Sequence, residues 1–135
     1  MNSKVALLLL VLLTITSLGL AAEPAKETRL LNKEIVVENY LIGLHSENNG
    51  LMSSSAFYLG ELRSGEAVIP LMKILKSSDE EELRIAAALA LLKIGDERGI
   101  YAIKKAIRFD ESKRVSDICA KFYNDYLTRN YTPEG

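Results

Sequence analysis

The sequence has few of the residues on which most active sites, metal sites and disulfide frameworks depend. Its 135 residues include one histidine, one cysteine and no tryptophan. A lone cysteine cannot form an internal disulfide, and a lone histidine has no second imidazole with which to hold zinc or iron. These shortages exclude a disulfide scaffold and a histidine-rich metal centre, and they argue against catalysis.

An excess of basic charge is also missing. The chain carries 17 Lys and Arg against 18 Asp and Glu, which gives a formal net charge of −1. Binding to a phosphate backbone requires clustered basic residues, and the sequence contains no glycine-rich phosphate loop. We therefore expect no nucleic-acid partner.

What the sequence does contain is an internal repeat. A shift of thirty-two positions places apolar residues on apolar residues: Leu51, Ala56, Leu59, Leu62, Leu71 and Leu75 fall on Leu83, Ala88, Leu91, Ile94, Ile103 and Ile107. A second shift brings Val115, Ala120, Tyr123 and Tyr126 into the same register. Repeats of this length are typical of helical arrays in which no unit buries its apolar face alone. The sequence predicts an all-α fold, a short α-solenoid of about three antiparallel helix pairs.

The central unit shows both helices of such a pair. Leu83, Ala87 and Leu91 follow the spacing of one helix face. Gly95 can adopt the left-handed conformation that ends a helix, and the Asp96 carboxylate can cap the next one. A second, shorter helix is expected over residues 98–108.

This unit resembles the short HEAT-like repeats of the phycobilisome-lyase type. The matching segments are Leu83-Arg84, the alanine-rich residues 86–90, residues 93–96 and the aliphatic residues 100–107. The resemblance implies helix pairs stacked in rows, with the second helices side by side on a concave face. Tetratricopeptide packing is the alternative, since the period is close to ~34 residues. The absence of Trp and of a closing Pro argues against it.

Helices are also predicted over residues 51–62, from residue 66 or 67 to 75, and over residues 112–127. Pro70 is tolerated only in a first turn, which sets the start of its helix. Ser64 and residues 77–79 are candidate caps. A first helix should end near Leu44, inside a repeat domain of residues 34–127. Residues 23–33 form a polar lead-in, either disordered or helical, and residues 128–135 a tail.

The first 22 residues have the anatomy of a secretory signal peptide. Lys4 precedes an apolar run over residues 5–20, and the small Ala21 and Ala22 offer a cleavage site. A membrane anchor is the alternative, but the run is shorter than the ~20 residues that a bilayer requires. No cysteine is placed for lipid attachment. We expect a bacterial protein, periplasmic or secreted, that meets the membrane only transiently.

The two potentially reactive side chains, His45 and Cys119, are not placed beside residues that would support catalysis. His45 lies in a predicted loop, and Cys119 aligns with Ala87 at a small, buried position. We expect no enzyme activity, no cofactor and no bound metal. The competing hypothesis is an enzyme or accessory of the phycobilin-lyase or HEAT-type hydroxylase kind. The hydroxylases depend on repeated histidine-glutamate pairs, which this sequence lacks.

Binding is the better use of such a scaffold. The residues expected to face outward from the second helices are Met52, Tyr58, Arg84, Lys93 and Lys121. Arg84 has a structural alternative, an ion pair with Asp79 or Asp110, which we favour. Phe57 is expected to point inward. The leading hypothesis is an exported, non-catalytic module that holds an unidentified protein along its concave face. A self-assembling structural protein, a homo-oligomer, is the companion hypothesis.

Overall fold

The computed structural model describes residues 23–131, so the proposed signal peptide over residues 1–22 and the last four residues lie outside the described part. The chain divides into two units, Met1–Val36 and Val37–Gly135. The described residues of the first unit are helical, so the polar lead-in takes the helical alternative.

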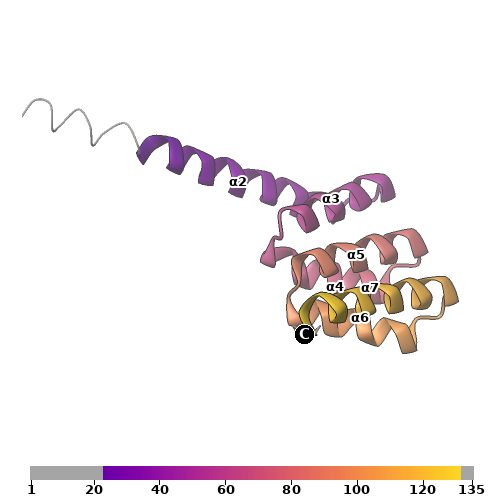
Figure 1. Ribbon diagram of the computed structural model, residues 1–135. Helices are drawn as coiled ribbons and strands as arrows, with labels where there is room; N and C mark the ends of the chain where they lie inside the picture. The colour runs from indigo at the N-terminus through magenta and orange to yellow at the C-terminus, as the bar shows by residue number, and fades with distance from the viewer. Residues whose placement is uncertain (1–22, 132–135) are drawn as a thin grey trace, which may run out of the picture. The chain divides into compact units, whose positions relative to one another are not determined.

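Residues 23–131 contain six α-helices and one short 3-10 helix, and no strand. In chain order these are α2 (Glu23–Gly43), α3 (Asn49–Glu61), η1 (Gly65–Ala67), α4 (Val68–Ser77), α5 (Glu81–Ile94), α6 (Glu97–Phe109) and α7 (Lys113–Tyr131), as Figure 1 shows. None of these described helices has the length and apolar character needed to cross a bilayer. The predicted all-helical class is confirmed.

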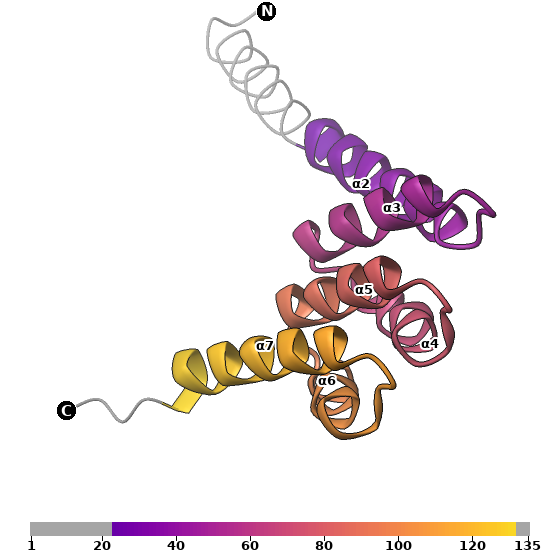
Figure 2. The ribbon, with the colours of Figure 1, turned by 90° about the vertical axis from the view of Figure 1, so that its right-hand side faces the viewer.

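Within the second unit the helices form two rows. Helices α3, α5 and α7 lie side by side in one row, and α4 and α6 lie in the other (Figure 2). Contacts join α3 to α5, α5 to α7, and α4 to α6, while α4 also packs on α5 and α6 on α7. The predicted stack of helix pairs is therefore present.

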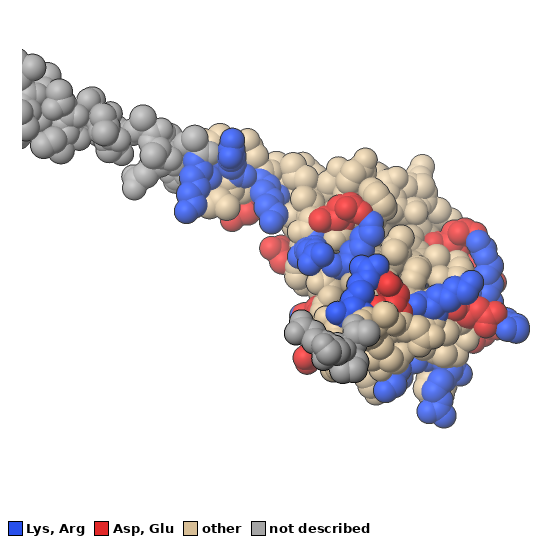
Figure 3. All heavy atoms as spheres, in the orientation of Figure 1, with Lys and Arg blue, Asp and Glu red and all other residues tan. Residues whose placement is uncertain are grey.

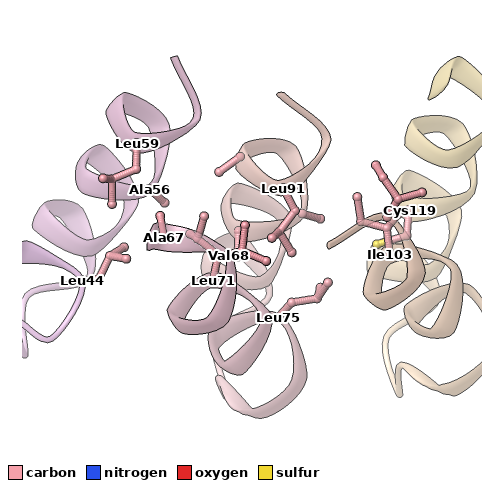
Figure 4. Packing of buried hydrophobic residues seen from close by; sticks show 14 of the residues in the cluster. Leu44, Ala56, Leu59, Ala67, Val68, Leu71, Leu75, Leu91, Ile103 and Cys119 are labelled. Carbon is pink, nitrogen blue, oxygen red and sulfur yellow. The ribbon is translucent and has the colours of Figure 1, made fainter. Parts of the chain in front are cut away.

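The buried residues follow the thirty-two-residue period. Leu59 and Leu91 occupy equivalent positions on α3 and α5, Leu71 and Ile103 on α4 and α6, and all four side chains are fully buried. Figure 4 shows core side chains from α3 to α7 pointing into the spaces between the helices. Burying one such aliphatic side chain contributes about 1.5–3 kcal/mol, so the repeated positions dominate the stability of the stack.

Small residues let the helices approach closely. A Cβ atom added to Gly60 of α3 would lie 2.9 Å from the Cα of Ala90 on α5. One position carries Ser55, Ala87 and Cys119 in successive units, and each is at most 1% exposed. The α3–α5–α7 row therefore depends on small side chains where backbones meet.

The turn after α5 has the predicted chemistry. Gly95 closes α5 in the left-handed conformation at φ +76°, and the Asp96 side chain accepts a hydrogen bond from the backbone N–H of Arg98 at 2.9 Å. Pro70 falls in the first turn of α4, as its missing N–H requires.

Two predicted caps are wrong. Ser64 makes no side-chain capping bond to η1, and the residue that precedes α5 is Glu80, which also makes none. The Ser78 hydroxyl instead accepts from the backbone N–H of Glu80 at 3.2 Å, just before the helix begins.

The C-terminal boundary also differs from the prediction. Helix α7 continues to Tyr131, so residues 128–131 are helical and not part of a tail. The Tyr126 ring meets the Tyr131 ring edge-on, and an ion pair joins Arg129 to Asp125 one turn earlier. These contacts support the last turn, which has no apolar periodicity of its own.

Candidate protein-binding face

The α3–α5–α7 row has one side packed on α4 and α6 and one side free of them, which we call the open face. In the view of Figure 3 the basic and acidic side chains of the repeat units are interspersed. The described residues therefore present mixed charge on this side, without the single-sign field that steers nucleic acids.

Three aromatic rings gather at the α3 end of this row. Tyr40 stacks on Tyr58 with ring centroids 4.9 Å apart, and Phe57 meets Tyr58 edge-on at 5.3 Å. Phe57 is 45% exposed and Tyr58 46%. We call these three residues the aromatic cluster. Their mutual contacts hold the rings of Phe57 and Tyr58 in position while both residues remain nearly half exposed.

Lys93 of α5 joins the aromatic cluster to the next helix. Its ammonium group lies 4.6 Å from the centre of the Phe57 ring, and it forms an ion pair with Glu61 of α3. Glu61 and Lys93 occupy equivalent positions in successive units. The pair is partly exposed, with side-chain exposures of 32% for Lys93 and 49% for Glu61.

The inward position expected for Phe57 is wrong. Ala56, Leu59 and Gly60 fill the buried side of α3, and Phe57 lies outside their arc. The repeat alignment contained a signal for this, because the equivalent position of the last unit carries the charged Lys121. In the central unit that position carries Leu89, which is only partly buried. A position that accepts a lysine in one unit lies at the surface of the stack, so a large ring there indicates a surface role.

The other candidate residues divide between surface and interior. Tyr58 and Lys121 are exposed, and Lys93 is partly exposed. Met52 is half-buried and lines a cleft at the edge of the stack where the loops lie. Arg84 is only 4% exposed, so its inclusion among the partner-binding residues is wrong.

Arg84 instead joins two inter-helix loops. Its Nε and Nη2 atoms each donate to a different carboxylate oxygen of Asp110 at 3.0 Å, and Nη1 donates to the backbone carbonyl of Ser78 at 2.7 Å. A guanidinium fork suits such bidentate pairing, and a buried charge requires a partner of this kind. The favoured structural role, pairing with Asp110, is confirmed.

With this geometry in place, the family can be assigned. A family model of HEAT repeats matches residues 39–121, from the end of α2 to the middle of α7. The chain belongs to the HEAT repeat family. The match favours HEAT packing over the tetratricopeptide alternative. No curated protein matches the chain. HEAT repeats commonly mediate protein–protein interaction, which makes this chain a helical-repeat module of the interaction type.

A cleft of about 430 Å³ lies at the loop edge of the HEAT stack. His45 and Lys73 are among its lining residues, with Met52 and Leu83 on its apolar side. The His45 Nδ1 atom lies 3.0 Å from the backbone carbonyl oxygen of Leu41, so the ring is held by its own helix. Within residues 23–131 no group of three His, Cys, Asp or Glu side chains is placed to hold a metal ion.

Cys119 lies inside the last HEAT pair. The side chain is fully buried on α7, as its alignment with Ala87 predicted. Desolvation, with a smaller contribution from the charge of Asp110, raises the pKa of the Cys119 thiol to about 11. The thiolate is the reactive form, so at neutral pH this cysteine is a poor nucleophile.

Proposed function

We propose that this HEAT-repeat chain is an exported, non-catalytic module that holds a protein partner against its open face. The observation that carries the proposal is the aromatic cluster, in which Phe57 and Tyr58 are nearly half exposed yet fixed by Tyr40 and Lys93. Rigid, partly exposed aromatic rings lose little conformational freedom on binding, and such residues dominate interface energetics.

The residues around the aromatic cluster suit a rim. Lys93 and Glu61 neutralise each other, and Lys121 supplies a separate positive charge on α7. Interface rims are polar and set orientation and association rate more than affinity. In a HEAT-like stack this row forms the concave side, so a partner lying along it would meet aromatic, charged and small side chains in turn.

The proposal that the protein is exported depends on the signal-peptide pattern of residues 1–22. The burial of the Cys119 thiol supports it indirectly. A Cys119 side chain that is inaccessible and protonated can persist in an oxidising compartment without mispairing. The expected mature N-terminus lies at residue 22 or 23, and mass spectrometry of the protein from the periplasm or medium measures it. Recovery of the intact chain, starting at Met1, would argue for the membrane-anchor alternative.

Photo-crosslinking tests the binding face. A crosslinking amino acid at Tyr58 should give a defined adduct in the native compartment, while the same group at Phe109, 72% exposed on α6, should give none. Replacement of Phe57 by alanine should remove the Tyr58 adduct without changing the circular dichroism spectrum. Equal adduct yields at Tyr58 and Phe109 would show that solvent exposure alone, and not position on the binding face, determines crosslinking.

The enzyme alternative has a separate test. Purified protein should show no chromophore absorption and no stoichiometric metal, while it retains the crosslinked partner. A tightly bound pigment or metal would favour the lyase or hydroxylase kind.

A further inference from the structure

The cleft of about 430 Å³ at the loop edge has an occupied counterpart one unit further along the chain. A shift of thirty-two residues places two of its lining residues, Met52 and Ser78, on Arg84 and Asp110. In that next unit the Arg84 guanidinium and the Asp110 carboxylate join two loops as a buried ion pair. We call the first place the Met52 cleft and the second the Arg84 site.

The loops that precede α3, α5 and α7 share one turn, so the equivalence holds in the backbone as well as in the alignment. Ser46, Ser78 and Asp110 each accept a hydrogen bond through the side chain from the backbone N–H two residues on, at 3.0, 3.2 and 2.9 Å. These three residues are thirty-two positions apart. Ser78 therefore occupies in its loop the place that Asp110 occupies in the next one.

The Met52 cleft lacks both members of the pair that closes the Arg84 site. Arg84 donates to Asp110 and also to the backbone carbonyls of Ser78 and Asp79, at 2.7 and 3.3 Å. In the Met52 cleft a thioether stands in place of the guanidinium, and the Ser78 hydroxyl stands in place of the carboxylate. Open space remains between the loops where a cation is bound one unit later.

Acidic groups for a cation are nevertheless present in the Met52 cleft. Asp79 and Glu80 both line it, and neither forms an ion pair with another residue of the described range 23–131. Glu80 stands where the next loop carries Ser112. The carboxylate that is missing at Ser78 is thus supplied two residues later, beside the same turn.

Two basic side chains, His45 and Lys73, line the same cleft. With His45 neutral, the lining carries two negative charges, from Asp79 and Glu80, and one positive charge, from Lys73. Lys73 is equivalent to Lys105, so the unit that holds a guanidinium in its Arg84 site also has a lysine at this position. The balance favours a cationic occupant, and a carboxylate is the competing one.

We propose that the Met52 cleft binds an arginine side chain of a protein partner, in the place that Arg84 takes one unit later. The apolar lining, which includes Leu44 and Ile74, suits the methylene groups of such a side chain. Its guanidinium would donate to the Ser78 hydroxyl and to a neighbouring carboxylate, and the planar fork suits this task better than an ammonium group. The proposal adds to the proposed function a second contact, at the loop edge instead of the open face.

An NMR titration of the purified protein, without any partner, tests the cleft directly. Acetyl-arginine amide should shift the backbone amide signals of Ser78 and Glu80 in a saturable way, with a dissociation constant in the millimolar range expected of one side chain alone. Acetyl-citrulline amide has nearly the same shape without the charge and should bind at least about tenfold more weakly. Equal binding of these two probes, stronger binding of acetyl-glutamate amide, or no saturable shift would each overturn the proposal.

Variants assign the binding to the cleft. Met52→Arg places a guanidinium inside it and should weaken binding of the arginine probe at least about tenfold. Ile69→Arg adds the same charge at a residue that is 58% exposed on α4 and outside the lining, and it should bind like the parent chain. Glu80→Gln should weaken binding, whereas Ser78→Asp, which restores the acceptor found at Asp110, should strengthen it.

The last two variants keep the test decisive if Met52→Arg does not fold, because they predict opposite effects from one loop. Unchanged binding in both Glu80→Gln and Ser78→Asp would overturn the proposal. The Tyr58 crosslink reports on the open face alone, so failure of one site is distinguishable from failure of the other.

Discussion

Two ion pairs connect helix α5 to distant parts of the chain, and they lie in different surroundings. Arg84, near the start of α5, pairs with Asp110, and the two side chains are 5% and 6% exposed. Lys93, near the end of α5, pairs with Glu61, and those side chains are 32% and 49% exposed. The buried pair holds two loops of the stack together, whereas the exposed pair lies where a partner can reach it.

The different solvent exposure of the two ion pairs determines how much each contributes to the stability of the fold. Water competes for and screens the exposed charges, so such a pair contributes little to stability. The buried pair has lost its water, and each charge depends on the other and on nearby backbone carbonyls. The predictions below test this contrast, starting with the largest expected effect.

Arg84→Met should cost about 3–5 kcal/mol in the free energy of unfolding, because it leaves the Asp110 carboxylate buried without its cation. Urea unfolding at neutral pH measures this value. Lys93→Met is the matched control on the same helix. A loss below about 1 kcal/mol for Arg84→Met would show that the loops relax and hydrate Asp110.

Gly60→Ala tests whether α3 is held to α5 by packing or by the exposed ion pair. The added methyl group would meet the Ala90 backbone at 2.9 Å, so we expect a loss of about 1–3 kcal/mol. Gly65→Ala is the control, since an added Cβ there meets nothing within 4 Å and the substitution should be neutral or slightly stabilising. Equal effects at both positions would contradict the close-packing argument.

Lys93→Met should cost no more than about 1 kcal/mol, because both its ion pair and its contact with the Phe57 ring are partly exposed. Its stronger effect should appear in binding, as a weaker adduct from a crosslinker at Tyr58. If Lys93→Met left both the melting temperature and the yield of the Tyr58 adduct unchanged, Lys93 would not be part of the binding face.

Sequence periodicity was sufficient for the stack and its core. The thirty-two-residue shift identifies positions such as Leu59 and Leu91, which are fully buried, because equivalent residues in a repeat meet equivalent neighbours. Gly95 and Asp96 were equally predictable, since their conformational and capping properties are local.

The binding face was less predictable because it depends on contacts between units. Whether Arg84 faces solvent or Asp110 is decided by a loop twenty-six residues away, which helical spacing does not reveal. Phe57 has the hydrophobicity of a core residue, but Gly60 and Ala90 bring α3 and α5 too close to leave room for a ring between them. The end of α7 depends on Tyr126 and Tyr131, whose spacing differs from that of the core positions.

A third charged pair has the smallest expected effect because it lies within one turn. Bidentate hydrogen bonding from Arg98 is the main reason why the pKa of Asp96 falls from 3.8 to about 2. A depressed carboxyl pKa stabilises the folded state at pH values above the ordinary pKa, and this contribution disappears as the pH falls from about 4 to about 2.

An NMR titration should find the Asp96 midpoint near 2, and Arg98→Met should move it toward 3.8. Asp96→Asn keeps a capping oxygen and should remove this pH dependence while α6 stays folded, since Asn caps as well as Asp. An unshifted Asp96 midpoint in Arg98→Met would assign the depression to the α6 N-terminus instead.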